Sequence, residues 1–418
     1  MKPLCQRIAK QEEWLANCKT GMKIWLAVLF IFQFEQTIGQ QFIQTALKQG
    51  PYKVGFKAGI HYDMGRPPLQ EQFMRFRQGR GVHISVWYPA TVKANHPNMM
   101  FSGYVDEISR MVNPREVTKR TRTESIHRMN VELSRAGGDS IVMLSHLAEL
   151  LNANTHAFRN ASYIEGSFPI LVYPESPHFN NILIEYLASY GYVVVSVSRH
   201  GTFTEDFNGQ HVSEIETAVQ DCQFALSVIK KEFKASGQPM AVVGTGISAL
   251  TGLAWMMRDP SIEALVSIDG AILNSLEYEL IKKSPYFDIN HSTKPMLVMH
   301  SPQASANPDL INNYRYADRY LLSLPHLREL YYLNLGAWEK MMPGILGPSP
   351  GDASVGFEWL ALYTLYFLDW KLKQGYHGRR FFEETPVQNG VPSGLMEYYF
   401  IPGKEVPSTE KELIAIKN

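Results

Sequence analysis

The chain has 418 residues, enough for one large α/β domain or two smaller ones, and no change in composition along it favours two. Hydrophobic residues make up 45% and charged residues 19%, a balance that buries a substantial core and excludes a disordered chain. Lysine plus arginine and aspartate plus glutamate each number 40, so no net charge favours nucleic acid, an anionic membrane or a basic partner.

The first forty residues contain a segment with the layout of a secretory signal. Residues 22–41 have a short basic start, an apolar run over 24–32, and the small residue Gly39 before a polar stretch. The apolar run is too short to cross a bilayer, which takes about 20 residues, so we expect no stable membrane span. We interpret residues 1–40 as an upstream extension plus a signal peptide starting at Met22, which predicts a periplasmic or secreted protein. The alternative is an N-terminal helix packed on the domain.

The next part of the chain changes from strand-like to helical patterning. Residues 52–62 and 82–87 have β-type patterning and predict opening antiparallel strands. From residue 104 to 158 the pattern becomes helical and polar, which predicts an inserted helical cap. The basic stretch over 119–128 within this cap is interpreted as an exposed helix surface. We expect one domain over 41–382.

Strands and helices then alternate with some regularity. Nearly continuous aliphatic strands separated by helices favour a parallel sheet covered on both faces, so the expected fold class is α/β. Functional groups in such a sheet gather at the carboxyl ends of its strands. The tail over 383–418 holds proline, glycine and one short β-like patch. The expected strands are 168–174, 192–199, 240–244, 263–269, 294–300 and 328–335, and the expected helices are 180–191, 212–233, 247–257, 309–322 and 355–373.

The stretch AVVGTGISALTG, residues 241–252, has the layout of a nucleophile elbow without its serine. The elbow pattern G-x-S-x-G places a serine on a tight turn between a strand and a helix. With Gly244 as the first glycine, Thr245 follows it and Gly246 takes the place of the nucleophile. Moving the pattern by two residues makes Ser248 the nucleophile, but it runs the strand through two glycines, which strand interiors disfavour. We therefore prefer Gly246, with Ser248 as the alternative.

Three segments in this order resemble a known fold: WYPA at 87–90, LASYGYVVVSVSRHG at 187–201, and the elbow stretch. Their order and spacing resemble the α/β-hydrolase fold, and within it the dienelactone hydrolase and platelet-activating-factor acetylhydrolase group, over about 51–375. The resemblance implies a mostly parallel sheet, a helical insertion, and a triad of serine, aspartate and histidine in that chain order. It also implies hydrolysis of an acetyl or short-acyl ester through an acyl-enzyme.

The triad carries over unevenly onto this chain. Gly246 has no side-chain atom that could form an acyl intermediate. Asp269, at the end of a predicted strand, matches the place of the acid in the acetylhydrolase branch, and capping of the next helix is the alternative. After the expected last strand the base position falls on Glu339, or on Trp338 if the loop is one residue shorter. Neither side chain can orient and deprotonate a serine as an imidazole does.

The oxyanion loop also differs from the family pattern. The family shows histidine and glycine after the first parallel strand, whereas this chain has Glu175 and Ser176. A carboxylate there would oppose the negative charge of a tetrahedral intermediate, although the backbone amide of Ile247 remains as one donor. We expect Glu175, Thr245, Ile247 and His300 to line the binding site.

The leading interpretation is therefore a degenerate hydrolase-fold protein that lacks serine-esterase activity and keeps its pocket for a small ester or acyl ligand, or has a structural role. One alternative is an active ester hydrolase with a relocated nucleophile such as Ser248. Another is a metal-dependent enzyme using Glu175, Asp269 and Glu339 with nearby histidines, although no metal motif such as H-E-x-x-H occurs. We predict neither cofactor nor metal, and the sequence sets neither the ligand nor the oligomeric state.

Overall fold

The computed structural model of the chain describes residues 42–43, 45–70, 79–112, 116–135, 137–204, 207–268, 271–301, 309–347 and 352–407. The helices and strands of this part belong to one unit, Ile43–Asn418. The predicted signal segment over 1–40 and Asp269 lie outside the described residues, so both stay predictions. None of the described helices is both long enough and apolar enough to cross a membrane.

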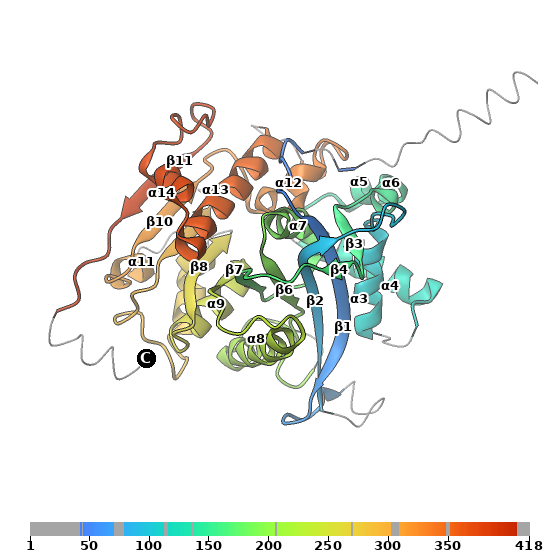
Figure 1. Cartoon of the computed structure of the whole chain (residues 1–418), viewed down its shortest axis with the longest axis horizontal. Coiled ribbons are helices and arrows are strands. Elements are labelled where there is room, and N and C mark those ends of the chain that lie inside the picture. The colour runs from blue at the N-terminus through green and yellow to red at the C-terminus, as the bar shows by residue number, and fades with distance from the viewer. Residues whose placement is uncertain are drawn as a thin grey trace, which may run out of the picture. The chain divides into compact units, whose positions relative to one another are not determined.

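A single mostly parallel sheet forms the centre of the described part (Figure 1). Its strand order is β11-β10-β9-β8-β7-β5-β6-β2-β1-β3, with β4 paired to β2. The six neighbours from β6 to β10 pair in parallel, whereas β1 with β2, β2 with β6, and β10 with β11 pair antiparallel. This architecture confirms the predicted α/β fold class. The strands are β1 (Lys53–Asp63), β2 (Arg80–Thr91), β3 (Ala157–Arg159), β4 (Ser162–Tyr163), β5 (Ile170–Tyr173), β6 (Val193–Val197), β7 (Met240–Thr245), β8 (Ile262–Ile268), β9 (Met296–His300), β10 (Arg319–Ser323) and β11 (Glu397–Ile401).

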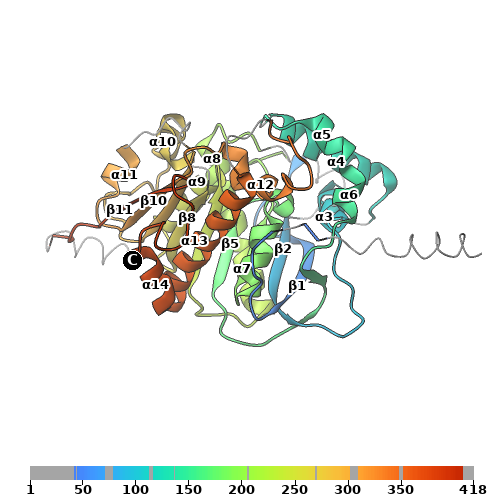
Figure 2. The ribbon, with the colours of Figure 1, turned by 90° about the horizontal axis from the view of Figure 1, so that it is seen from above.

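Helices cover both faces of this sheet (Figure 2). The strands alternate accordingly: in β7, Ala241 and Val243 belong to one hydrophobic cluster, whereas Met240 and Val242 belong to the other. A strand buried on both faces needs apolar residues at every position, which explains its continuous aliphatic run. One cluster includes α7 (Asn181–Ser189), α12 (Asn334–Trp338), α13 (Ala353–Lys373) and α14 (Tyr376–Glu383), and the other includes α8 (Val212–Glu232), α9 (Ser248–Met256), α10 (Ser275–Ile281) and α11 (Asp309–Asn313).

Four helices fill the chain between β2 and β3: α3 (Ser102–Val112), α4 (Lys119–Arg135), α5 (Ser140–Ser145) and α6 (Leu147–Asn152). On α4, Ser125, Met129 and Leu133 are buried at four-residue spacing, as expected for a helix with one face against the core. Residues 128, 132 and 135 share another face of the same helix, because they are four and three positions apart. That second face carries the charged side chains of Arg128, Glu132 and Arg135.

The predicted order of elements near the end of the sheet is wrong. The last parallel strand is β10, inside the predicted helix over 309–322, whereas the predicted strand over 328–335 forms the 3₁₀ helix η3 (Glu329–Tyr332) and the start of α12. The neighbours Tyr331 and Tyr332 are both buried, and burial of neighbouring residues is compatible both with a strand covered on two faces and with this 3₁₀ helix. Short apolar runs carry no periodicity that distinguishes strand from helix.

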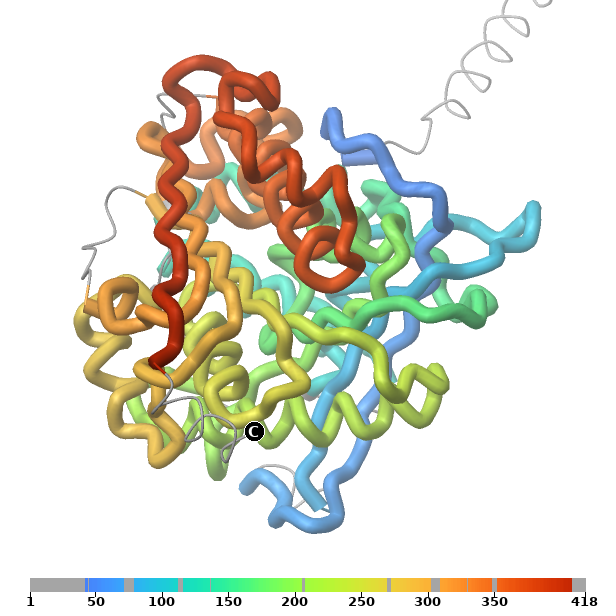
Figure 3. The backbone as a smooth tube through the Cα atoms, turned by 60° about the vertical axis from the view of Figure 1, so that its left-hand side comes forward, coloured from blue at the N-terminus to red at the C-terminus, as the bar shows by residue number. Residues whose placement is uncertain are grey.

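Part of the predicted tail over 383–418 joins the sheet. Strand β11 lies antiparallel beside β10, and Figure 3 shows the two running side by side. Tyr320 of β10 stacks on Phe400 of β11 with their ring centroids 4.9 Å apart. The aromatic pair and the ladder of backbone hydrogen bonds together hold this edge strand in place.

Candidate functional site

The turn between β7 and α9 has the backbone geometry of an elbow. Strand β7 ends at Thr245 and α9 begins at Ser248. Gly246 lies between them with a φ of +49°, in the left-handed region that glycine adopts without strain, and its amide donates to the carbonyl of Ile268 at 3.0 Å. Gly246 therefore stands where an elbow carries its nucleophile, and the apex of the turn has no side chain.

The two glycines of the turn serve different purposes. A Cβ on Gly244 would lie 2.6 Å from the backbone of Ser248 and Ala249, so this position needs glycine for close packing of the strand and the helix. A Cβ on Gly246 would have no heavy atom of the described residues within 4 Å. The apex thus opens into free space, and a side chain there would meet no steric obstacle from the described part of the chain.

Ser248, the alternative nucleophile, does not lie at the apex. It is fully buried in the first turn of α9, and its hydroxyl donates to the carbonyl oxygen of Pro174 at 3.0 Å. Its other neighbour is Glu175, with Oε2 3.4 Å away. Within the described residues no imidazole lies in hydrogen-bonding range of the Ser248 oxygen. The structure gives this serine a role in joining α9 to the loop after β5.

Glu175 directs its carboxylate at the elbow. It lies two residues after the end of β5, and its Oε2 accepts a hydrogen bond from the hydroxyl of Thr245. Its Oε1 lies 3.1 Å from Nη2 of Arg199, with which it forms a half-buried ion pair. Burial and the Glu175 charge together raise the pKa of Tyr173, whose hydroxyl lies 2.9 Å from the Thr245 oxygen. Glu175 thus places a carboxylate directly beside the turn, where it does not favour a developing oxyanion.

The remaining predicted site residues are Ile247, in the elbow turn itself, His300 and Glu339. Ile247 precedes α9, and its side chain fills the space next to Gly209, where a Cβ would come within 2.2 Å of it. His300 ends β9, and its Nδ1 lies 3.2 Å from the carbonyl oxygen of Ser301. The prediction of Glu339 as the residue after the last strand is wrong, because it lies at the end of α12 and accepts a hydrogen bond from the Gly344 amide at 2.9 Å.

The first histidine after the true last parallel strand is His326, three residues beyond β10. Its side chain is exposed, and no hydrogen bond connects it to the turn at Gly246 within the described residues. The sequence analysis missed His326 because it placed the last strand nine residues too late. The described part of the chain therefore places no histidine at the elbow that could act as the base for a serine nucleophile.

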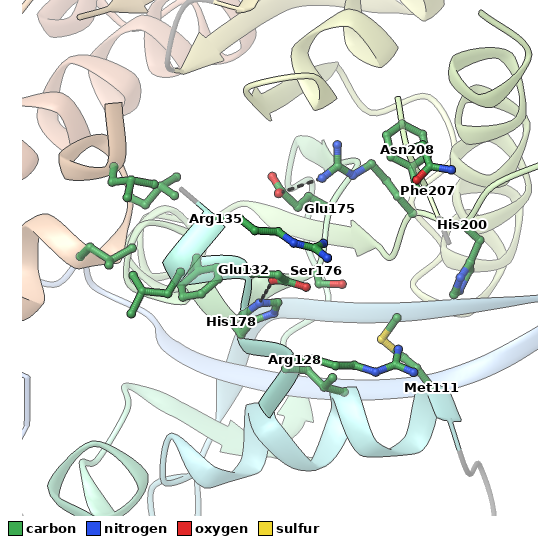
Figure 4. A pocket seen from close by; sticks show the side chains of 17 residues that line it. Met111, Arg128, Glu132, Arg135, Glu175, Ser176, His178, His200, Phe207 and Asn208 are labelled. Carbon is green, nitrogen blue, oxygen red and sulfur yellow. Dashed lines mark hydrogen bonds and ion pairs between the residues drawn. The ribbon is translucent and has the colours of Figure 1, made fainter. Parts of the chain in front are cut away.

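A pocket of about 750 Å³ lies on the Glu175 side of the elbow (Figure 4). Its walls come from α3 and α4 of the insertion, from the loops after β5 and β6, and from residues 330–335. Half of the lining is polar and half is apolar. The polar residues are Arg128, Glu132, Arg135, Glu175, Ser176, His178, Arg199, His200 and Asn208, and the apolar residues are Ile108, Met111, Leu133, Phe179, Phe207, Leu330, Leu333 and Leu335.

Sequence reasoning identified only part of this pocket. It selected Glu175, but it interpreted the helix that carries Arg128 as a solvated surface and singled out neither Glu132 nor Arg135. The signal was present in their spacing, because positions 128, 132 and 135 share one face of α4. What the sequence does not show is that this face is directed toward a cavity.

His178 and Glu132 are hydrogen-bonded across the pocket. Nε2 of the histidine lies 3.0 Å from Oε2 of the glutamate, and the histidine is 6% exposed. Burial acts to raise the pKa of the Glu132 carboxyl, but the hydrogen bond from His178 and the charges of His178, Arg199 and Arg128 outweigh it and lower that pKa. Glu132 is therefore ionised and already paired.

The described residues contain no group of three or more histidine, cysteine, aspartate or glutamate side chains placed to hold a metal ion. The metal hypothesis depends on Asp269, which lies outside those residues, and on Glu339, which does not line the pocket. Of the two carboxylates that do line it, Glu132 is hydrogen-bonded to His178 and Glu175 is ion-paired with Arg199.

Comparisons with known proteins support the fold and give no evidence on the chemistry of the site. No protein-family model and no curated protein sequence matches the chain. Among solved structures, the chain is similar to a ferulic acid esterase from Streptomyces cinnamoneus, with a TM-score of 0.57 and 16% identity over 86% of this chain and 99% of that one. The protein thus has an α/β fold similar to that of this esterase, and nothing in this likeness points specifically to the dienelactone hydrolase group.

Proposed function

We propose that this protein binds a small ligand in the pocket beside the elbow and lacks the serine-esterase mechanism of the fold it shares. The observation that carries the proposal is Gly246 at the apex of the turn, with a φ of +49° and no side chain. The ion pair between Glu175 and Arg199, directly beside the turn, supports it, because it occupies the place from which an active site would stabilise an oxyanion.

The direct test is hydrolysis of 4-nitrophenyl acetate. We expect the purified wild-type chain to show no turnover above a Ser248→Ala variant, and we expect neither protein to be labelled by a fluorophosphonate probe. Both assays report a serine with raised nucleophilicity, which needs an adjacent base. Turnover by the wild type well above the Ser248→Ala variant would overturn the proposal.

Restoring the missing serine should not restore activity. A hydrogen bond of ordinary length from a serine hydroxyl brings its acceptor within roughly 3.7 Å of Cβ. No heavy atom of the described residues lies within 4 Å of a Cβ built on Gly246. We expect Gly246→Ser to fold, to lose about 1–2 kcal/mol in the free energy of unfolding because of its positive φ, and to gain no esterase activity. Thermal unfolding and the nitrophenyl assay measure both, and a clear gain in turnover would show that a base is present.

A second candidate function, hydrolysis through a different serine, is favoured by one chain of polar contacts. The hydroxyl of Ser176, a residue of the pocket wall, donates a hydrogen bond to the hydroxyl oxygen of Ser198 at 3.2 Å. That Ser198 oxygen lies 3.5 Å from Nδ1 of His83. Nε2 of that histidine lies 3.5 Å from Glu107. Burial would raise the pKa of Glu107, but His83, Arg159 and Arg110 lower it to about 2. Under this function the fluorophosphonate probe labels the wild type and fails to label Ser176→Ala.

A further inference from the structure

We infer that the pocket takes an apolar monoanion, a ligand with one carboxylate group on an aliphatic chain or an aromatic ring. This inference rests on the proposed function, because it names the ligand class of the same pocket. It comes from the charges and surfaces that the chain brings together there, and three separate features carry it.

The first feature is two arginines that have no hydrogen-bonding or ion-pair partner among the described residues. Arg128 and Arg135 extend from one face of α4 toward the cavity in Figure 4. Neither makes a hydrogen bond or an ion pair with any of the described residues, whereas Arg120 and Arg122 of the same helix are paired with Glu124 and Asp106. Their guanidinium groups are therefore available to a ligand, and a guanidinium matches a carboxylate with two parallel hydrogen bonds.

The second feature is the charge of the lining. Three arginines, 128, 135 and 199, face two carboxylates, those of Glu132 and Glu175. The formal charges of these five side chains sum to one positive charge. Both carboxylates already have partners, Glu132 in His178 and Glu175 in Arg199, and Nη1 of Arg199 is buried without a hydrogen-bond partner among the described residues. One negative charge on the ligand would balance the pocket and satisfy these donors, whereas a neutral ligand would leave them desolvated and unpaired.

The third feature is the apolar part of the lining. It consists of Ile108 and Met111 of α3, Leu133 of α4, and Leu330, Leu333 and Leu335. A volume of about 750 Å³ is within the range of small-molecule sites. An apolar chain or ring of the ligand would cover this surface and release water from it, while its head remains beside the guanidinium groups.

Calorimetric titration of the full chain with matched probe pairs tests the inference. The probes are octanoate with octanamide and 4-phenylbutanoate with 4-phenylbutanamide, because each amide keeps the shape of its acid and removes the charge. We expect at least one carboxylate to bind about tenfold or more tightly than its amide, and added salt to weaken the carboxylate only. Octyl phosphate at pH 8.5, a dianion, should bind no more tightly than octanoate.

The variant Arg128→Gln/Arg135→Gln separates charge from shape. We expect it to weaken carboxylate binding about tenfold or more and to leave amide binding unchanged. Arg120→Gln is the matched control, because Arg120 lies on the same helix, is 87% exposed on its side chain and pairs with Glu124 rather than lining the pocket. Because all these positions are on the surface of α4, thermal unfolding should show that the variants remain folded.

Each result bears on a different statement. Equal binding of acid and amide, unchanged carboxylate binding by Arg128→Gln/Arg135→Gln, or tighter binding of octyl phosphate would overturn the assignment of an apolar monoanion and leave the binding function standing. Failure of all four chain and ring probes to bind would overturn the inference together with the proposed binding function.

Discussion

Replacing Asp221 with alanine is expected to lower the free energy of unfolding by about 3–5 kcal/mol, the cost of leaving one member of a buried ion pair without its partner. Nε and Nη2 of Arg80 each lie 2.8 Å from an oxygen of this carboxylate, and the two residues are 2% and 1% exposed. Arg66 adds a third contact at 2.7 Å. Without Asp221, the Arg80 guanidinium would remain buried and uncompensated.

Urea unfolding at neutral pH measures this effect, with Glu232→Ala as the control. Glu232 ends the same helix, α8, but its ion pair with Lys57 is about 40% exposed on both sides, so its removal should cost less than about 1 kcal/mol. Equal losses in the two variants would contradict the expectation. Arg80 also donates to the carbonyls of Gly201 and Thr202, which begin the loop carrying Phe207 of the pocket wall, so Asp221→Ala should weaken ligand binding as well.

The second large effect is a pH dependence of stability that originates at Glu185. This residue is 1% exposed and accepts hydrogen bonds from the Tyr104 hydroxyl at 2.6 Å, the Asn181 amide at 2.8 Å and the His156 backbone at 2.6 Å. Burial raises the pKa of its carboxyl to about 7, because it outweighs the opposing effect of these hydrogen bonds. The buried carboxyl joins α7 to α3 of the insertion.

The direction in which stability changes with pH follows from the number of protons that the folded and unfolded chains bind. Between the unfolded pKa of 4.5 and the folded pKa of about 7, the folded chain holds a proton at Glu185 that the unfolded chain has lost. The contribution of this group to stability is therefore complete below the unfolded pKa and is lost as pH rises through the folded one. The stability that Glu185 contributes, and that is lost between these two pKa values, is about 3 kcal/mol.

Unfolding free energies measured by urea at pH 4.5, 5.5, 6.5 and 7.5 test this. Between pH 4.5 and about 7, the unfolding free energy of the wild type should fall by about 3 kcal/mol more than that of Glu185→Gln, because glutamine does not titrate. The informative quantity is the difference in slope, because glutamine also changes the hydrogen bonds around it. Glu124→Gln, at an exposed position of α4, serves as the control and should keep the wild-type slope. Parallel curves for Glu185→Gln and wild type would be inconsistent with a raised pKa.

The strand and helix pattern of this chain was predictable as far as local periodicity reaches. The long helices α8, α9 and α13 and the strands β5 to β9 fall where the aliphatic runs and their glycine boundaries predict. The failures occur in short aromatic or mixed segments. Residues 319–323 form a strand because β9 and β11 pair with them on both sides, and neither partner can be seen within a short window of sequence.

The candidate site, too, was predictable only in part from the sequence. That Gly246 provides no nucleophile follows from the sequence alone, because a residue without a side chain has none in any fold. The tertiary structure alone decided that Ser248 turns inward toward Pro174, that Glu175 meets Thr245, and that Glu339 lies away from the pocket. These facts depend on contacts between residues about seventy positions apart or on the path of a loop, and no local pattern encodes either.

The pocket is the clearest case of what folding adds. The spacing of Arg128, Glu132 and Arg135 places them on one side of a helix in any structure that keeps α4 helical. Only the position of that helix beside the loops after β5 and β6 makes this side the wall of a cavity shared with Glu175 and Arg199. Sequence thus determined which side chains exist and which of them share a local face, and the long-range packing of the insertion on the sheet determined which faces meet.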